Sequence, residues 1–438
     1  MRPSGEDSSE AETPTFLWVR SRYNPRMKHS MLSVMNGLDA YLARPEPAFR
    51  WAKKSEKRVG DVLVEELSLT SQTWQGNVWE HRVQVCRPDR LRYRDFCVLR
   101  NTGGNGGERD EAMGIQLAKD SGCVTATMFN NPMQPLYGGL SEDALIAYTW
   151  QKYLETGDES WPLHFPMAKA VLKTMDALQH HTKGGLQRFL VFGASKRGWT
   201  TWLVGASQDK RVVGIAPQVI DVLKVAQQIP HQLDMLGGKP SEEIEDYVRT
   251  GFDKLLLTPP GKKLMDLEDP ISYRDRLTLP KLLQLGTNDR YWAQDALNLY
   301  WDDLKGPKWV LYAPNSGHGL EDRVRVMSTL AAFTRSLAAR RPWPTLQWQW
   351  TPEDNGARLR FSSTSPIRAA RLFRCLGPTT DFRDQKWSSN EVPVSSNGFD
   401  AWQATPRRGF AAAYGEATFD LDGQPFTLST QIRIFGKN

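Results

Sequence analysis

The sequence predicts an α/β protein with a mostly parallel, eight-stranded sheet, helices on both faces and a smaller β-sandwich-like domain at its C-terminal end. Three observations carry this prediction. Short apolar runs alternate with helical patterns through most of the 438 residues, which is typical of parallel sheets covered on both faces. One of these runs ends at Gly-Ala-Ser, and a helical pattern follows at once. After residue 342 the helical patterns stop, and apolar residues alternate with polar ones, which indicates antiparallel strands.

The predicted strands are short and, from residue 95 onwards, mostly rich in Val, Leu and Phe. We expect them at about residues 60–70, 81–87, 95–101, 123–129, 188–194, 211–219, 280–286 and 308–313. The predicted helices lie at 108–121, from 142 onwards with Ser141 as a cap, 167–180, 293–304 and 321–339. Because strands and helices alternate, the connections predict parallel neighbours. Ligands of such sheets bind at the carboxyl ends of the strands.

Residues 188–199 read Arg-Phe-Leu-Val-Phe-Gly-Ala-Ser-Lys-Arg-Gly-Trp. An apolar strand that stops at Gly-x-Ser before a helix is typical of a nucleophile elbow, which would expose Ser195 on a strained turn above a helix N-terminus. The usual motif is Gly-x-Ser-x-Gly. Here Arg197 takes the place of the second glycine and Gly198 follows it. Gly-x-Ser triplets also occur by chance, so this prediction depends on the partners downstream.

Two downstream residues complete a predicted catalytic triad. Asp289 follows the run at 280–286, and His318 lies between two glycines after the run at 308–313. Ser195, Asp289 and His318 thus occur in the order that the α/β-hydrolase fold requires. His318 would act as general base, and Asp289 would orient its ring. Asp221 is the alternative acid, and a helix-capping Asp289 or an ordinary loop histidine remains the structural alternative.

The sequence also predicts an oxyanion hole and a pocket beside Ser195. One donor would be the backbone N–H of Lys196, and the other would come from the glycine-rich loop at 101–107. A phosphate-binding loop is the alternative, but no Gly-Lys-Ser/Thr closes this one. The candidate residues are Lys196, Gly103 and Gly104 for the hole and Trp199, Tyr291 and Trp292 for the pocket. Glu142, Asp143 and Asp234 could anchor a substrate amine, although solvated positions are the more ordinary interpretation of these three acids.

The chain divides into three predicted regions: a partly disordered N-terminal extension (1–37), a catalytic domain (38–342) and an accessory β domain (343–438). Within the catalytic domain, residues 221–278 interrupt the alternation of strands and helices. An insertion at this point would arch over Ser195 as a cap, with a surface excursion as the alternative. The β domain could bind substrate, carbohydrate or a partner, but we favour a structural brace.

Composition excludes several classes of function. The net charge of +6 is small, and no basic cluster interleaves with aromatic residues, which argues against nucleic-acid binding. No apolar run reaches membrane-spanning length. The four cysteines, Cys86, Cys97, Cys123 and Cys375, form no Cys-x-x-Cys motif, so we expect buried thiols and neither a metal nor another cofactor. The first residues lack a signal-peptide pattern, so we expect an intracellular protein or one numbered without its leader. The oligomeric state stays open.

Several segments together resemble the PhoPQ-activated pathogenicity-related proteins. They are residues 38–51, 195–199 with the Lys-Arg-Gly-Trp tail, 269–277, 301–308 and 315–319. The resemblance implies an α/β-hydrolase core, a C-terminal β domain and peptidase or esterase activity, and many members are exported. One departure is Met133, which occupies the loop where the family usually shows Pro-Asn-Gln-Pro, so we expect the pocket of this chain to differ there.

The predicted function is therefore that of a serine hydrolase acting on a small peptide or ester through an acyl-enzyme. A peptidase of aminopeptidase or dipeptidyl-peptidase type is the first choice. A carboxylesterase of the same fold is the first alternative. A binding or signalling protein that keeps the fold without turnover is the second.

Overall fold

The structure is a computed structural model that describes residues 37–436. The N-terminal extension predicted for residues 1–37 falls outside the described residues, except for Gly37. Within the described chain, no helix has the length and apolar character needed to cross a membrane. All four cysteines are described, and each is a buried free thiol, as predicted.

Eight strands match the predicted ones: β2 (Val62–Trp74), β3 (Asn77–Pro88), β4 (Tyr93–Asn101), β5 (Cys123–Met128), β6 (Arg188–Ala194), β7 (Val212–Gln218), β8 (Lys281–Gly286) and β9 (Lys308–Ala313). Their order in the sheet is β2-β3-β5-β4-β6-β7-β8-β9. The strand β3 is antiparallel to β2 and β5, and all neighbours from β5 to β9 are parallel. This is the α/β-hydrolase fold, and the predicted fold class is confirmed.

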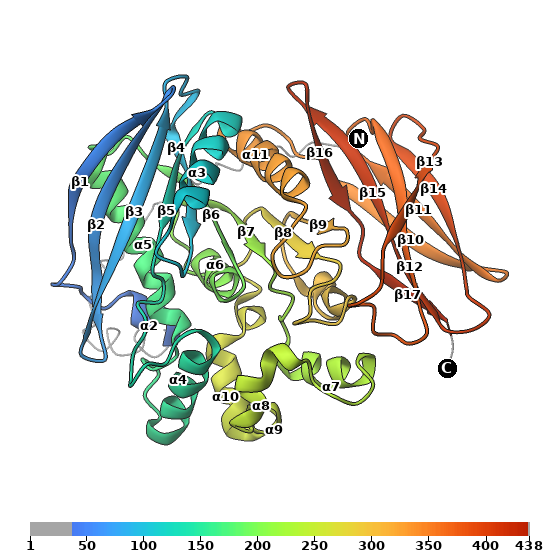
Figure 1. The fold of residues 1–438 in the computed structure, drawn as a ribbon, viewed down its shortest axis with the longest axis horizontal. Coiled ribbons are helices and arrows are strands. Elements are labelled where there is room, and N and C mark those ends of the chain that lie inside the picture. The colour runs from blue at the N-terminus through green and yellow to red at the C-terminus, as the bar shows by residue number, and fades with distance from the viewer. Residues whose placement is uncertain (1–36, 437–438) are drawn as a thin grey trace, which may run out of the picture. The chain divides into compact units, whose positions relative to one another are not determined.

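A ninth strand, β1 (Arg50–Val59), was not predicted. It pairs antiparallel with β2 at the edge of the sheet (Figure 1). Its sequence Arg-Trp-Ala-Lys-Lys-Ser-Glu-Lys-Arg-Val shows no apolar alternation, because all of its residues except Trp51 are exposed. Charged side chains, lysines above all, are typical of sheet edges, where they discourage pairing with another chain. A strand of this kind gives no hydrophobic signal in the sequence.

Helices cover both faces of the sheet. They are α3 (Glu108–Ser121), α5 (His164–His181), α6 (Lys196–Ala206) and α11 (Arg323–Ala339), whereas α4 (Glu142–Thr156) packs on other helices. Alternate residues of β4 pack against different helices on the two faces of the sheet. Phe96 and Val98 belong to the apolar cluster that includes residues of α3 and α11. Cys97 and Leu99 belong to the cluster that includes residues of α5 and α6. The central strands are buried on both sides, as their continuous apolar runs predicted.

One local prediction is wrong, and another is confirmed only for the position of the residue. Residues 293–304 form no α-helix but two 3₁₀ turns, η4 (Ala296–Leu299) and η5 (Trp301–Asp303). Over such a short stretch an α-helix and a 3₁₀ turn show the same spacing of apolar residues in the sequence, because a 3₁₀ turn also places residues i and i+3 on one side. Ser141 does occupy the N-cap position of α4, but its side chain makes no capping hydrogen bond. The side chain of Gln134 instead accepts the backbone N–H of Glu142, at 2.9 Å.

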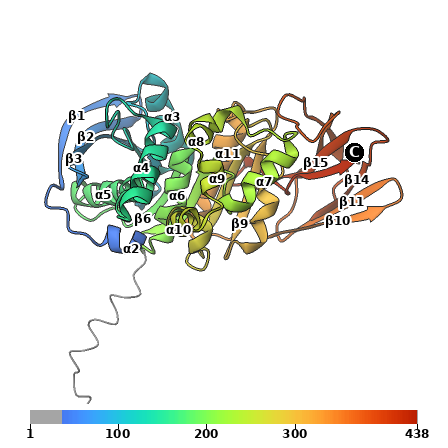
Figure 2. The same cartoon turned by 90° about the horizontal axis from the view of Figure 1, so that it is seen from below.

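Residues 221–278 form four short helices, α7 (Val225–Met235), α8 (Glu245–Arg249), α9 (Phe252–Leu255) and α10 (Pro259–Glu268), with 3₁₀ turns between and after them. Figures 1 and 2 show these helices grouped beside α4, and α8 and α10 contact that helix. We call residues 221–278 the cap.

The C-terminal strands form two layers. The strands β10 (Leu346–Glu353), β11 (Gly356–Ser363) and β14 (Gly398–Ala404) make a three-stranded sheet. The other strands are β12 (Ala369–Gly377), β13 (Ser388–Val392), β15 (Phe410–Leu421), β16 (Gln424–Ser429) and β17 (Arg433–Gly436). They continue the main sheet, because Ser429 of β16 pairs with Val310 of β9. The C-terminal strands are therefore joined to the hydrolase core by backbone pairing as well as by the connecting chain.

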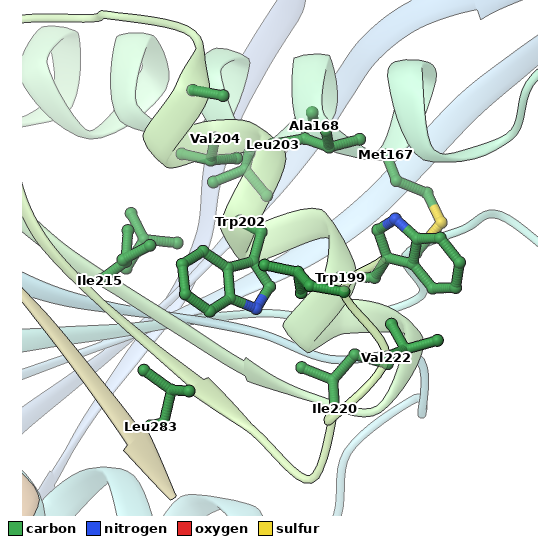
Figure 3. Packing of buried hydrophobic residues seen from close by; sticks show 14 of the residues in the cluster. Met167, Ala168, Trp199, Trp202, Leu203, Val204, Ile215, Ile220, Val222 and Leu283 are labelled. Atoms are coloured by element: carbon green, nitrogen blue, oxygen red, sulfur yellow. The ribbon is translucent and has the colours of Figure 1, made fainter. Parts of the chain in front are cut away.

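The helix after the elbow is buried along its whole length. Trp202 has no exposed surface and lies toward Ile215 and Leu283, whereas Trp199 lies toward Met167 and Val222 (Figure 3). Buried tryptophans contribute large apolar area and hold their surroundings in one arrangement. The core therefore fixes the position of α6, and with it the turn that carries Ser195.

Candidate active site

Ser195 lies on a strained turn between β6 and α6. Its backbone has φ 58° and ψ −127°, a conformation that costs a non-glycine residue free energy and persists only where the surroundings enforce it. Two backbone hydrogen bonds do so. The N–H of Ser195 donates to Gln218 O at 2.9 Å, and the N–H of Trp199 donates to Ser195 O at 2.9 Å. Hydrogen bonds thus join the turn to the end of β7 and to α6, the helix that follows it.

The two glycines of the motif are needed for close packing. A Cβ on Gly193 would lie 2.7 Å from Arg197 O. A Cβ on Gly198 would lie 2.8 Å from Gln218 O and 2.7 Å from a methyl group of Ile220. The glycine that allows helix and strand to approach therefore stands three residues after Ser195 in this chain, which explains why Arg197 can occupy the usual glycine position.

The side chain of Arg197 connects the elbow to two neighbouring segments of the chain. Its guanidinium forms two hydrogen bonds with Glu142, at 2.7 and 2.8 Å, and its Nε donates to Asn131 O at 2.6 Å. A Cβ on Gly103 would lie 1.6 Å from this guanidinium, so a larger residue there would have to displace Arg197 from its present position. Although burial acts to raise the pKa of Glu142, the hydrogen bonds and charge of Arg197 lower it to about 2. The pair therefore stays ionised in neutral solution.

The predicted amine anchors are not free. Asp143 forms an ion pair with Lys196 at 2.8 Å and accepts a hydrogen bond from Tyr247 at 2.8 Å. Glu142 is engaged by Arg197. Asp234 is exposed on α7. With their charges matched or solvated, these three carboxylates offer little to a substrate amine.

His318 and Asp289 are hydrogen-bonded to each other. The Nδ1 of His318 lies 2.8 Å from Oδ2 and 3.0 Å from Oδ1 of Asp289. Asp289 is buried and also accepts the backbone N–H of Tyr291, at 3.0 Å. The other ring nitrogen of His318, Nε2, is buried and has no hydrogen-bond partner among the described residues. A histidine with its Nδ1 on a carboxylate and its Nε2 free can accept a proton at Nε2.

The loop that carries His318 packs against the end of β8. A Cβ on Gly286 would lie 2.4 Å from the backbone oxygens of Ser316 and Gly317. The ring of Tyr291 covers the imidazole, with ring centroids 4.3 Å apart. These contacts hold the ring of His318 beside Asp289.

The alternative acid, Asp221, is engaged elsewhere. It is buried, and its Oδ1 accepts a hydrogen bond from the hydroxyl of Tyr300 at 2.7 Å. Burial, with a smaller effect of the nearby Asp289, raises the pKa of Asp221 from 3.8 to about 7. The structure thus brings Asp289, and not Asp221, to His318.

This raised pKa has a measurable effect on stability. Between about pH 4 and pH 7 the folded state holds a proton on Asp221 that the unfolded state has lost, so the free energy of unfolding falls as the pH rises through that window. Asp221→Asn keeps an acceptor for Tyr300 and removes the titration. We expect this variant to gain stability relative to the wild type between pH 5 and pH 8 in urea unfolding. A difference that does not change with pH would contradict this assignment.

Two cavities meet at Ser195. The first, the cap cavity, has a volume of about 90 Å³ and lies between the elbow and the cap. Apolar and aromatic side chains line most of it, including the predicted pocket residues Trp199, Tyr291 and Trp292. The second, the arginine cavity, has a volume of about 300 Å³ and is lined by Gly103, Gly104, His318, Arg100 and Arg323 among others. Ser195 lines both cavities.

Two charged residues of these cavities, unpaired within the described chain, were not predicted. Asp253 of α9 lines the cap cavity, and Arg323 of α11 lines the arginine cavity. Neither side chain has an ion pair or hydrogen bond to another residue in the described part of the chain. Both stand in sequence contexts with ordinary surface charges, and no motif distinguishes them.

The chain is similar to known proteins over most of its length. Residues 38–383 match the family described as PhoPQ-activated pathogenicity-related protein. The chain is 28% identical over 425 residues to autocrine proliferation repressor protein A of Dictyostelium discoideum, covering 87% of this chain and 85% of that protein.

Among similar solved structures is acetyl xylan esterase 1 from Thermoanaerobacterium sp. JW/SL YS485, at 14% identity and TM-score 0.44, covering 68% of this chain and 93% of the esterase. Another is an S-formylglutathione hydrolase from Agrobacterium tumefaciens, at 15% identity and TM-score 0.46, covering 66% and 99%. A third is a proline iminopeptidase from Mycobacterium smegmatis, at 15% identity and TM-score 0.39, covering 60% and 96%. At such identities the likeness extends to the fold alone.

Proposed function

The chain belongs to the PhoPQ-activated pathogenicity-related protein family, and we propose that it is a serine hydrolase that works through an acyl-enzyme on Ser195. One observation carries the proposal: His318 is hydrogen-bonded to Asp289 through Nδ1, its Nε2 is free, and it lines the same cavity as Ser195. A nucleophile, a base and a residue that orients the base are the three parts that such catalysis needs.

In the first half of the reaction, Nε2 of His318 takes the proton of the Ser195 hydroxyl as Oγ adds to the substrate carbonyl. The carbonyl oxygen becomes an oxyanion. When this tetrahedral intermediate collapses, the bond from carbon to the leaving nitrogen or oxygen breaks, and His318 gives its proton to the leaving atom. Asp289 stabilises the imidazolium that exists between the two proton transfers.

In the second half, water adds to the acyl-enzyme and gives a proton to His318. Collapse of the second intermediate releases the carboxylic acid and returns the proton to Ser195. The oxyanion of each intermediate would be held by the backbone N–H of Lys196, at the N-terminus of α6, and by an N–H from the Gly103–Gly104 loop. The side chain of Arg197 donates to Glu142 and to Asn131 O, so its role is to connect the elbow to these two residues and not to bind the oxyanion.

Between peptides and esters, the cap cavity favours a substrate with an apolar acyl group and a free amine. Its apolar lining suits a large side chain. Its one carboxylate without an ion pair in the described part of the chain, Asp253, can pair with an ammonium group. Asp143, which also lines the cavity, is already paired with Lys196. We therefore propose a peptidase that recognises the amino end of its substrate, with Asp253 as the anchor.

A screen of leucine p-nitroanilide, its N-acetyl derivative and short aryl esters tests this proposal, with Ser195→Ala as the blank. We expect Asp253→Asn to raise KM for the free-amine substrate about tenfold or more, because a charge-assisted hydrogen bond is lost, and to leave the esters unaffected. Asp234→Asn is the matched control, because it removes an exposed carboxylate from the same cap.

Two outcomes of the screen would contradict different parts of the proposal. If esters alone are cleaved, and Ser195→Ala abolishes this cleavage, the protein is an esterase and Asp253 is not an anchor. If the residual activity is the same in Ser195→Ala, the assigned nucleophile is wrong.

A further inference from the structure

The arginine cavity lies on the side of Ser195 where the leaving group must depart. If Ser195 and His318 act as proposed, His318 returns its proton to the leaving atom, so this atom has to lie close to the imidazole. His318 lines the arginine cavity together with Ser195. His318 does not line the cap cavity, although the ring of Tyr291, which does, lies tilted against the imidazole at 4.3 Å between centroids. In that case the leaving group would lie in the arginine cavity and the acyl group in the cap cavity.

The charges that line the arginine cavity are unequal. Three arginines line it, whereas Glu142 is the one carboxylate in its described lining. Glu142 is neutralised by Arg197. Arg100 forms an ion pair at 2.6 Å with Asp110, which lies outside the lining. Arg323 is left with its charge unmatched.

The acids on the neighbouring segment form no ion pair with Arg323. Glu321 keeps its charge but lies outside the lining of the arginine cavity, and its carboxylate accepts the backbone N–H of Gly317 at 2.8 Å. Asp322 pairs with Arg325 at 2.9 Å and caps α11. Arg323 itself is exposed, begins α11 and has no ion pair or side-chain hydrogen bond within residues 37–436. The proximity of its charge contributes to lowering the pKa of Arg100, after the larger effect of burial. The guanidinium groups of Arg100 and Arg323 thus lie near each other, and of the two only Arg100 has an ion pair within residues 37–436.

We propose that the arginine cavity binds a carboxylate on the leaving group through Arg323, so that the substrate is a short peptide cleaved just before its C-terminal residue. This inference rests on the proposed function. A guanidinium presents paired N–H donors that match a carboxylate. An α-carboxylate lies two bonds from the leaving nitrogen, so it enters the cavity together with that atom. An apolar acyl residue at the cap cavity, with its amine at Asp253, completes the substrate.

Paired substrates test the inference. Leucyl-alanine has a C-terminal carboxylate, leucyl-alaninamide does not, and leucine p-nitroanilide has an uncharged leaving group and reports hydrolysis independently of any carboxylate. We expect the wild type to cleave leucyl-alanine with a kcat/KM about 10- to 100-fold above that of leucyl-alaninamide, the range of a charge-assisted hydrogen bond. In Arg323→Gln this ratio should fall to near one, and Arg323→Lys should restore part of it. Hydrolysis of the p-nitroanilide should not change in either variant.

The matched control is Arg360→Gln, which removes an exposed arginine from β11 of the C-terminal sheet. Equal kcat/KM of the wild type for the two dipeptides, with the p-nitroanilide cleaved, would overturn the inference and leave the proposed hydrolase intact. An unchanged preference in Arg323→Gln would overturn it as well. No Ser195-dependent cleavage of any of the three substrates would overturn the proposed peptidase, and the inference with it.

Discussion

Replacing Ser195 by alanine is expected to lower kcat/KM by about 10⁴- to 10⁶-fold, the range seen when a serine hydrolase loses its nucleophile. The reason is chemical. Alanine has no oxygen to add to the carbonyl, so the acyl-enzyme cannot form, and only the oxyanion donors and substrate binding are left to act on a water molecule. Steady-state rates on the best substrate of the screen, measured at equal concentrations of folded enzyme, give the ratio.

The control for Ser195→Ala is its stability. Alanine keeps the Cβ, so the backbone at this position has the same strain, and the bonds to Gln218 O and from Trp199 N–H are made by the main chain. We expect urea unfolding to match that of the wild type. Full activity in a folded Ser195→Ala protein would exclude the mechanism.

Replacing Asp289 by asparagine is expected to lower kcat by about 10⁴-fold, by analogy with serine proteases in which the same change leaves the geometry intact but selects the wrong imidazole tautomer. Asp289 accepts both the Nδ1 proton of His318 and the N–H of Tyr291. An amide can accept only with its oxygen, so its NH₂ group would force Nδ1 to become an acceptor and leave the proton on Nε2. The ring would then be unable to accept the Ser195 proton.

Asp221→Asn is the matched control for this variant. It makes the same carboxylate-to-amide change at a buried position in the same region, but Asp221 is bonded to Tyr300 and not to His318. We expect it to keep most of its activity. A loss of activity in Asp221→Asn as large as that in Asp289→Asn would mean that the assignment of the acid is wrong.

Much of the candidate site could be predicted because its residues follow the ends of predicted strands. Ser195, Asp289 and His318 each lie within a few residues of the end of a short apolar run, and the carboxyl ends of parallel strands meet at one edge of a sheet. Their order along the chain then indicated which fold would bring them together. The pairing of His318 with Asp289 could therefore be predicted without knowing the conformation of the loops that carry them.

The remainder depends on contacts between segments far apart in the chain. Arg197 meets Glu142 across 55 residues, and nothing in either segment indicates that pairing. Because Glu142 is ion-paired with Arg197, it is not available to bind a substrate amine. Asp253 and Arg323 were missed for the opposite reason, since what distinguishes them is the lack of a partner within the described chain. The edge strand β1 was missed because an exposed strand needs no apolar pattern.

Whether Ser195 is the nucleophile can be measured by incubating the purified protein with an active-site serine phosphonate, followed by mass spectrometry of the peptide that contains Ser195. We expect one covalent phosphonate on Ser195, no labelling in Ser195→Ala, and much slower labelling in His318→Ala, because the base that activates the hydroxyl is missing. Folded wild-type protein that stays unlabelled, or carries the phosphonate on another residue, would contradict this assignment and favour a binding protein that keeps the hydrolase fold.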